Sequence, residues 1–145
     1  MKRTILIFVL AICPFLTEAR GQSNREVRVN YVLTNIGVKR DVQAKLRPLL
    51  EAYLADTKKA NQAYDGLKKK LELKIKGGTI SNEQADQLLA LKWVADEKEL
   101  AVKKAYEKKF KTVLTSKKTY QCFDLLNDKK SKMLGKSKSG DSDDE

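Results

Sequence analysis

Histidine is absent from this chain of 145 residues, and proline and cysteine occur only twice each. Histidine is the commonest general base and the commonest transition-metal ligand in proteins, so its absence argues against an enzyme and against a metal centre. Only carboxylates remain as an alternative set of metal ligands. We therefore expect a non-catalytic protein without a cofactor, acting in binding, scaffolding or as a chaperone.

Long hydrophobic runs are also lacking, and the longest one is confined to the N-terminus. Residues 4–16 are almost wholly apolar and follow the basic start Met1-Lys2-Arg3. This run is shorter than the roughly 20 residues that span a bilayer, but it has the length of a signal-peptide core. The small residues Ala19 and Gly21 follow it. We predict a signal peptide over residues 1–21, cut before Gln22, with a cut after Ala19 as the second choice, and export to the periplasm without stable membrane insertion.

The two cysteines have different surroundings. Cys13 ends the stretch Leu10-Ala11-Ile12-Cys13, which resembles a lipobox, so a lipoprotein anchored through Cys13 is the alternative to a soluble periplasmic protein. The bulky Ile12 and the following Pro14 argue against that alternative. Cleavage leaves only Cys122, which excludes an intramolecular disulfide. The apolar neighbours of Cys122 favour a buried thiol over an intermolecular disulfide.

Acidic residues are outnumbered, with 19 Asp and Glu against 30 Lys and Arg. Removal of Lys2, Arg3, Arg20 and Glu18 takes a net +2 from the formal charge of +11 and leaves +9 on the mature chain. Nucleic acid is the usual partner of such a basic protein, but an exported protein rarely meets any. Excess lysine beside apolar stripes instead favours acidic or amphipathic polypeptides as partners.

The scarcity of proline and the absence of alternating apolar patterns after residue 21 predict an all-α domain over residues 22–135. We expect helices over about 24–36 and 39–76, a third from the capping box that begins at Ser81, and a fourth capped by Thr115 or Ser116. Gly37 and Gly77-Gly78 are expected to end the first two helices. Residues 136–145 contain no apolar side chain and are expected to be a disordered polar and acidic tail.

Two apolar stripes predict that the two long helices pack lengthwise as an antiparallel, coiled-coil-like hairpin. The first stripe consists of Leu46, Leu50, Tyr53, Thr57, Ala60, Tyr64, Leu67 and Leu71. The second consists of Leu88, Leu91, Ala95, Val102, Tyr106, Phe110 and Val113. On the fourth helix, we expect one face to carry Tyr120, Phe123, Leu126 and Met133. Pro48 either bends the second helix or indicates that the helix starts late, after an irregular segment at residues 38–46.

Four stretches of the chain resemble a known family. They are residues 38–53, with Pro48 followed five residues later by Tyr53, and residues 80–89, 97–100 and 106–114. Together they resemble the Spy/CpxP-like (LTxxQ-type) periplasmic proteins, above all the relatives labelled sensors of ECF-type sigma factors. The Leu-Thr step of the family motif stands at Leu114-Thr115, whereas the first copy of the motif, at residues 38–42, lacks it. Metal-sensing members bind their ion largely through histidine, which this chain lacks.

The resemblance implies an elongated four-helix hairpin or cradle that forms an antiparallel homodimer and has no catalytic chemistry. It further implies an envelope-stress role, either as a chaperone of unfolded polypeptides or as an adaptor of a membrane-bound stress sensor or anti-sigma factor in a sigma-factor or two-component pathway. A structural or assembly protein without clients is the alternative. The candidate polypeptide-binding residues are Arg40, Lys45, Arg47, Lys58, Lys59 and Lys68.

Overall fold

The computed structural model describes residues 19–134, and these residues form helices and connecting turns with no strand. The helices are α1 (Ala19–Asn35), α2 (Arg40–Lys70), α3 (Glu72–Lys76), α4 (Asn82–Lys111), α5 (Ser116–Asn127) and α6 (Lys129–Leu134). The prediction of an all-α fold is confirmed. Cys13 and the predicted tail lie outside the described residues, and so does the predicted signal peptide up to residue 18. The helix α1 begins before the predicted cleavage between Gly21 and Gln22, which stays a prediction.

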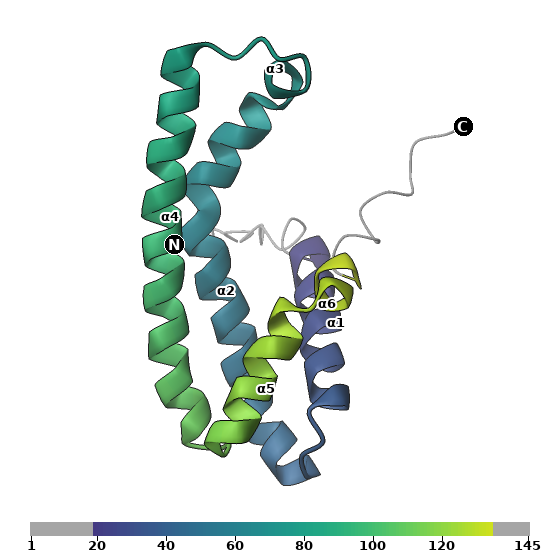
Figure 1. Ribbon diagram of the computed structural model, residues 1–145. Helices are drawn as coiled ribbons and strands as arrows, with labels where there is room; N and C mark the ends of the chain where they lie inside the picture. The colour runs from purple at the N-terminus through teal and green to yellow at the C-terminus, as the bar shows by residue number, and fades with distance from the viewer. Residues whose placement is uncertain (1–18, 135–145) are drawn as a thin grey trace, which may run out of the picture.

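The two longest helices, α2 and α4, form an antiparallel hairpin (Figure 1). The chain reverses direction after α3, where Gly78 adopts a positive φ of 65°. A side chain at such a φ is strained, so glycine suits this position. Figure 1 shows α4 as a nearly straight rod beside the more curved α2. The predicted pairing of two long helices is thus confirmed.

Both predicted stripes lie along the contact between α2 and α4. In the first stripe Leu46, Leu50, Tyr53 and Leu71 are buried, and the other four residues are half-buried. In the second stripe Ala95, Tyr106 and Phe110 are buried. Apolar spacing of three and four residues therefore identified the inner faces of both helices.

The remaining helices cover only one half of the hairpin. Helix α1 packs against the N-terminal part of α2 and α5 against the C-terminal part of α4, whereas α6 packs on α1 and α5 (Figure 1). At their junction, the rings of Tyr53, Tyr106, Phe110 and Phe123 lie with centroids 5.4–6.0 Å apart in tilted and edge-on pairs. These are favourable aromatic geometries. The core therefore sits at one end of the molecule, and the other end consists of two helices that pack only against each other.

Three helix boundaries follow the local signals in the sequence. Ser81 forms the expected capping box with Gln84, and Thr115, rather than Ser116, caps α5 by accepting a hydrogen bond from the Lys118 backbone N–H at 3.3 Å. Gly37 follows α1 with a φ of 64°. The caps formed by Ser81 and Thr115 satisfy N–H groups that helix N-termini leave without partners.

The predicted second helix is divided in the structure, because α2 ends at Lys70 and α3 follows after Leu71. The predicted fourth helix is divided at Asp128 (φ −56°, ψ 137°). Here the Asp128 carboxylate accepts hydrogen bonds from the Tyr31 hydroxyl at 2.6 Å and from the Lys130 backbone N–H at 3.2 Å. A tertiary contact therefore fixes the break between α5 and α6.

The predicted inner face of the fourth helix is partly wrong. Tyr120 is 76% exposed and Met133 is 69% exposed, whereas Cys122 and Leu126 are buried. The break at Asp128 separates Met133 from the helical register of α5, and α1 contacts the face that carries Cys122. The prediction that Cys122 is a buried thiol is confirmed.

Pro48 lies inside α2, which begins at Arg40. The alternative of a late helix start after an irregular segment at residues 38–46 is therefore wrong. A proline in this position removes the hydrogen bond that the carbonyl of Ala44 would otherwise accept. Pro48 itself is exposed, so water can satisfy that carbonyl.

Candidate functional site

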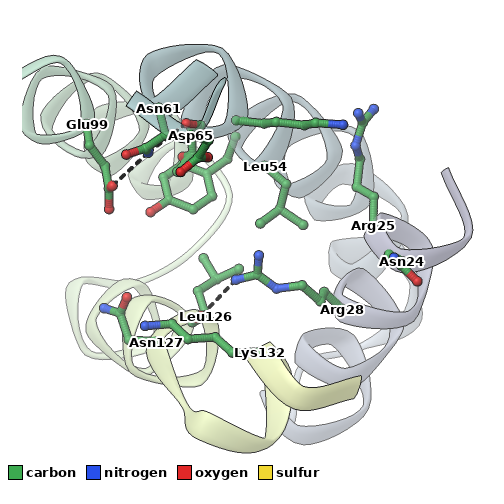
Figure 2. A pocket seen from close by; sticks show the side chains of 13 residues that line it. Asn24, Arg25, Arg28, Leu54, Asn61, Asp65, Glu99, Leu126, Asn127 and Lys132 are labelled. Atoms are coloured by element: carbon green, nitrogen blue, oxygen red, sulfur yellow. Dashed lines mark hydrogen bonds between the residues drawn. The ribbon is translucent and has the colours of Figure 1, made fainter. Parts of the chain in front are cut away.

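A cleft of about 550 Å³ opens where helices α1, α5 and α6 meet the hairpin (Figure 2). Its walls come from α1, α2, α4, α5 and α6, so no single segment of the chain contains it. The lining residues are Asn24, Arg25, Arg28, Tyr53, Leu54, Thr57, Lys58, Asn61, Asp65, Glu99, Leu126, Asn127 and Lys132. The volume falls in the range typical of sites for small ligands or peptide side chains.

Apolar side chains form part of the cleft wall. Tyr53, Leu54 and Leu126 are buried members of the main core, and each presents an edge to the cleft. The guanidinium of Arg28 lies between Leu54 and Leu126 (Figure 2). Its Nη2 donates a hydrogen bond to the carbonyl of Leu126 at 3.0 Å, and its Nε donates to Ser131 Oγ at 3.4 Å. Burial lowers the pKa of Arg28, but a guanidinium stays protonated at neutral pH.

Four cationic side chains, Arg25, Arg28, Lys58 and Lys132, come to the cleft from α1, α2 and α6. The ion pairs among the described residues are all between residues four apart on one helix, and none includes these four cations. Their charges are therefore free to attract an anionic group.

The acidic side chains of the cleft lie together on α2 and α4. Figure 2 shows Asp65 and Glu99 near each other, with Arg25 on the far side of Leu54. Glu99 accepts hydrogen bonds from Asn61 Nδ2 at 3.0 Å and pairs with Lys103 Nζ at 2.7 Å. Burial alone would raise the pKa of Glu99, but these two contacts outweigh it and hold the pKa below its ordinary value. The two carboxylates thus mark an acidic end of the cleft, and Arg25 marks the basic end opposite them (Figure 2).

The six basic residues that the sequence suggested all lie on α2 but do not form one surface. Lys58 alone lines the cleft. Arg47 donates a hydrogen bond to Asn30 Oδ1 at 2.8 Å, and Lys68 Nζ lies 5.6 Å from the centroid of the Tyr64 ring. The other three, Arg40, Lys45 and Lys59, are exposed. Consecutive positions on a helix point in different directions, which separates Lys58 from Lys59.

Sequence reasoning missed the other three cations of the cleft. Arg25 and Arg28 stand three residues apart and so share one face of α1, a signal that was available in the sequence. Lys132 had no such signal, because only the break at Asp128 turns α6 toward the cleft.

A second surface feature lies on α4, on the side away from α2. Leu89, Trp93, Val94 and Leu100 are 46–62% exposed there, and we call these four residues the outer α4 face. Leu89, Trp93 and Leu100 are four and seven residues apart and share one face of α4, turned away from Ala95 and Tyr106, and Val94 lies beside that face. Apolar residues on both sides of one helix are unusual for a solvated rod and indicate an interaction surface.

Two further features of the described residues concern metals and membranes. Residues 19–134 contain no group of three or more carboxylate or thiol side chains arranged to hold a metal ion. None of the helices α1 to α6 is long and apolar enough to cross a membrane.

The chain was also compared with known proteins. No family model, no curated protein and no solved structure matches it. Functional inference for this chain therefore begins from its own residues, chiefly the cleft and the outer α4 face.

Proposed function

We propose that this chain is a non-catalytic, exported envelope-stress protein that binds unfolded or regulatory polypeptides, as the Spy/CpxP-like resemblance implies. In this proposal it acts either as a chaperone or as an adaptor of a membrane-bound stress sensor. The single observation that carries the proposal is the outer α4 face, an exposed apolar stripe on a basic, elongated helical body. The clients that fit this face are polypeptide segments with both apolar and acidic side chains.

The chemistry of the outer α4 face supports this role. Trp93, at its centre, is 62% exposed, and the neighbouring Leu89 and Leu100 are each 52% exposed. Burying these side chains against an apolar client stabilises the complex by about 25 cal/mol per Å² of apolar surface removed from water. Lys104 and Lys108 lie exposed farther along α4 and supply positive charge for acidic client residues.

A client-aggregation assay tests the proposal. The protein at stoichiometric excess should delay aggregation of several unrelated clients, and added salt should weaken the effect, because charges are screened within about 10 Å at 0.1 M salt. The double variant Trp93→Ser, Leu100→Ser should lose most of the protection. Leu73→Ser is the matched control, because Leu73 is 85% exposed but lies on α3. Failure to protect any client at low salt would contradict the chaperone role and leave the adaptor role.

The adaptor role has its own test. A pull-down from periplasm with the purified protein, before and after envelope stress, should recover a membrane-bound sensor or anti-sigma factor. The double variant should recover less of it than Leu73→Ser does.

A second candidate function, structural pairing with another copy of the chain, is favoured by the charges along α4. Glu83 and Asp86 lie exposed in its N-terminal half, and Lys104 and Lys108 lie exposed in its C-terminal half. An antiparallel second copy would place acidic residues opposite lysines on both sides of the Trp93 stripe. This arrangement corresponds to the antiparallel homodimer that the resemblance implies.

Light scattering at several protein concentrations distinguishes the two candidates. Pairing predicts a doubled molar mass and a concentration-dependent blue shift in the fluorescence of Trp93, the single tryptophan of the chain. The variant Lys104→Glu, Lys108→Glu should remain a monomer, and the further changes Glu83→Lys and Asp86→Lys should restore the dimer. A monomer at all concentrations would rule out structural pairing.

A further inference from the structure

We infer that the cleft between the hairpin and helices α1, α5 and α6 binds the C-terminal end of a polypeptide, with an apolar last residue and a free carboxylate. The outer α4 face plays no part in this inference, which therefore stands apart from the proposed client binding. The charges, the apolar walls and the dimensions of the cleft all favour such a ligand.

Charge complementarity assigns the carboxylate to the basic end of the cleft. Arg28 is fixed there by its hydrogen bonds to the Leu126 carbonyl and to Ser131, so its position is set before a ligand arrives. A guanidinium has five N–H donors, and donors that those bonds leave free can bind a carboxylate oxygen. Arg25, Lys58 and Lys132 add three more positive charges to the lining of the cleft.

The apolar walls assign the last side chain. Leu54 and Leu126 lie close to the Arg28 guanidinium (Figure 2). A ligand that carries an apolar group directly beside its negative charge therefore fits this part of the cleft. The terminal residue of a polypeptide has this structure, because its carboxylate and its side chain are attached to the same Cα.

Polar groups along the cleft favour a peptide over a fatty acid. The side-chain amides of Asn24 and Asn127 line the cleft and can pair with the N–H and C=O groups of a peptide. The hydrocarbon chain of a fatty acid offers no partner to either amide.

The acidic end of the cleft suggests which residues precede the apolar C-terminal residue of the ligand. Lys58 and Asp65 stand seven residues apart on α2, which corresponds to about 10 Å along a helix axis. An extended peptide covers this distance in about three residues. A basic side chain two or three positions before the terminus therefore reaches Asp65.

Isothermal titration calorimetry with the purified protein tests the inference. The probe is the acetylated pentapeptide Ser-Lys-Ala-Leu-Leu with a free C-terminal carboxylate, and its C-terminal amide is the matched control. The free acid should bind at least tenfold more tightly than the amide. Equal affinity of the two peptides, or no detectable binding of the free acid, would overturn the inference.

Substitutions then locate the site. Lys58→Glu should weaken binding of the free acid at least tenfold, whereas Lys59→Glu, one residue along α2 and outside the cleft, should have no effect. Arg25→Glu serves as a second variant on a different helix, and circular dichroism establishes that each variant folds. Equal effects of Lys58→Glu and Lys59→Glu would show a non-specific charge effect and contradict a site in the cleft.

Two further measurements distinguish peptide binding in the cleft from fatty-acid binding and from client binding on the outer α4 face. Decanoate shares the carboxylate and the apolar chain, so decanoate binding as tight as that of the peptide would overturn the assignment to polypeptide. The double variant Trp93→Ser, Leu100→Ser should bind the peptide normally even where it fails to protect clients. Loss of peptide binding in that variant would contradict a separate site.

Discussion

Tyr106 and Cys122 are buried titratable side chains in the core. The Tyr106 hydroxyl donates a hydrogen bond to Asp56 Oδ2 at 2.7 Å, and burial together with this bond raises the pKa of Tyr106 to about 12. Burial raises the pKa of the Cys122 thiol to about 12, from an ordinary value of 9.0. Both groups are therefore neutral in the folded protein at physiological pH.

These pKa values predict the stability of the protein in alkali. A group with a raised folded-state pKa stabilises the fold fully below its unfolded pKa, and this stabilisation is lost as the pH rises toward the folded value. The free energy of unfolding should therefore fall between pH 9 and about 12. Urea titrations at several pH values measure this slope, which should be shallower in Cys122→Val. An unchanged slope in that variant would mean that the thiol is accessible to water when folded.

A second prediction at this scale concerns the aromatic cluster. Phe110 is fully buried and contacts Tyr53, Tyr106 and Phe123. Phe110→Ala should lower the free energy of unfolding by about 3–5 kcal/mol, because it removes apolar contacts and leaves a cavity. Tyr120→Ala should change it by less than about 0.5 kcal/mol, since Tyr120 is 76% exposed. Thermal melts of the two variants compare them, and similar melting temperatures would contradict the described core.

Among the elements, α5 depends on its N-terminal cap. Thr115 caps this helix of 12 residues through its side-chain oxygen, whereas the neighbouring Ser116 is the first residue of the helix itself. Thr115→Ala should therefore destabilise the protein by about 1 kcal/mol, and Ser116→Ala should have little effect. Denaturant unfolding of both variants measures the difference. A larger loss of stability in Ser116→Ala than in Thr115→Ala would identify Ser116 as the N-cap.

Helix α4 carries apolar side chains on two of its faces. Its inner face carries the stripe that contains Tyr106 and Phe110, and its outer face carries Leu89, Trp93 and Leu100. Ion pairs such as Glu99–Lys103 and Glu107–Lys111 join residues four apart along the same helix. The helix is therefore held by α2 on one side and offers an apolar surface on the other.

For the whole molecule, charge distribution leads to a prediction about the last ten residues. Residues 136–145, outside the described part of the chain, carry four acidic side chains at Asp141, Asp143, Asp144 and Glu145. They follow α6, whose Lys132 lines the cleft. If this segment competes with acidic clients for the lysines, its deletion should strengthen client binding at low salt. Titration of an acidic, unfolded client into the full and shortened proteins measures this, and equal affinity would contradict competition.

The architecture of the hairpin was predictable because it depends on local patterns. Spacings of three and four placed Leu50, Tyr53 and Phe110 on the inner faces, and Ser81 and Gly78 act within a few residues of their own positions. Helix periodicity and capping are properties of neighbouring residues, so one sequence is enough to read them.

Only the tertiary structure decided where the candidate sites lie. Arg28 and Lys58 are 30 positions apart in the sequence, and Lys132 is farther still, yet all three line one cleft. The contact of Tyr31 with Asp128 breaks the last helix and so sets the direction of α6. The sequence by itself determined the helices, their caps and the inner faces of the long pair. The cleft and the exposed outer α4 face depend on which helix packs against which, and this is decided by contacts between residues far apart in the chain.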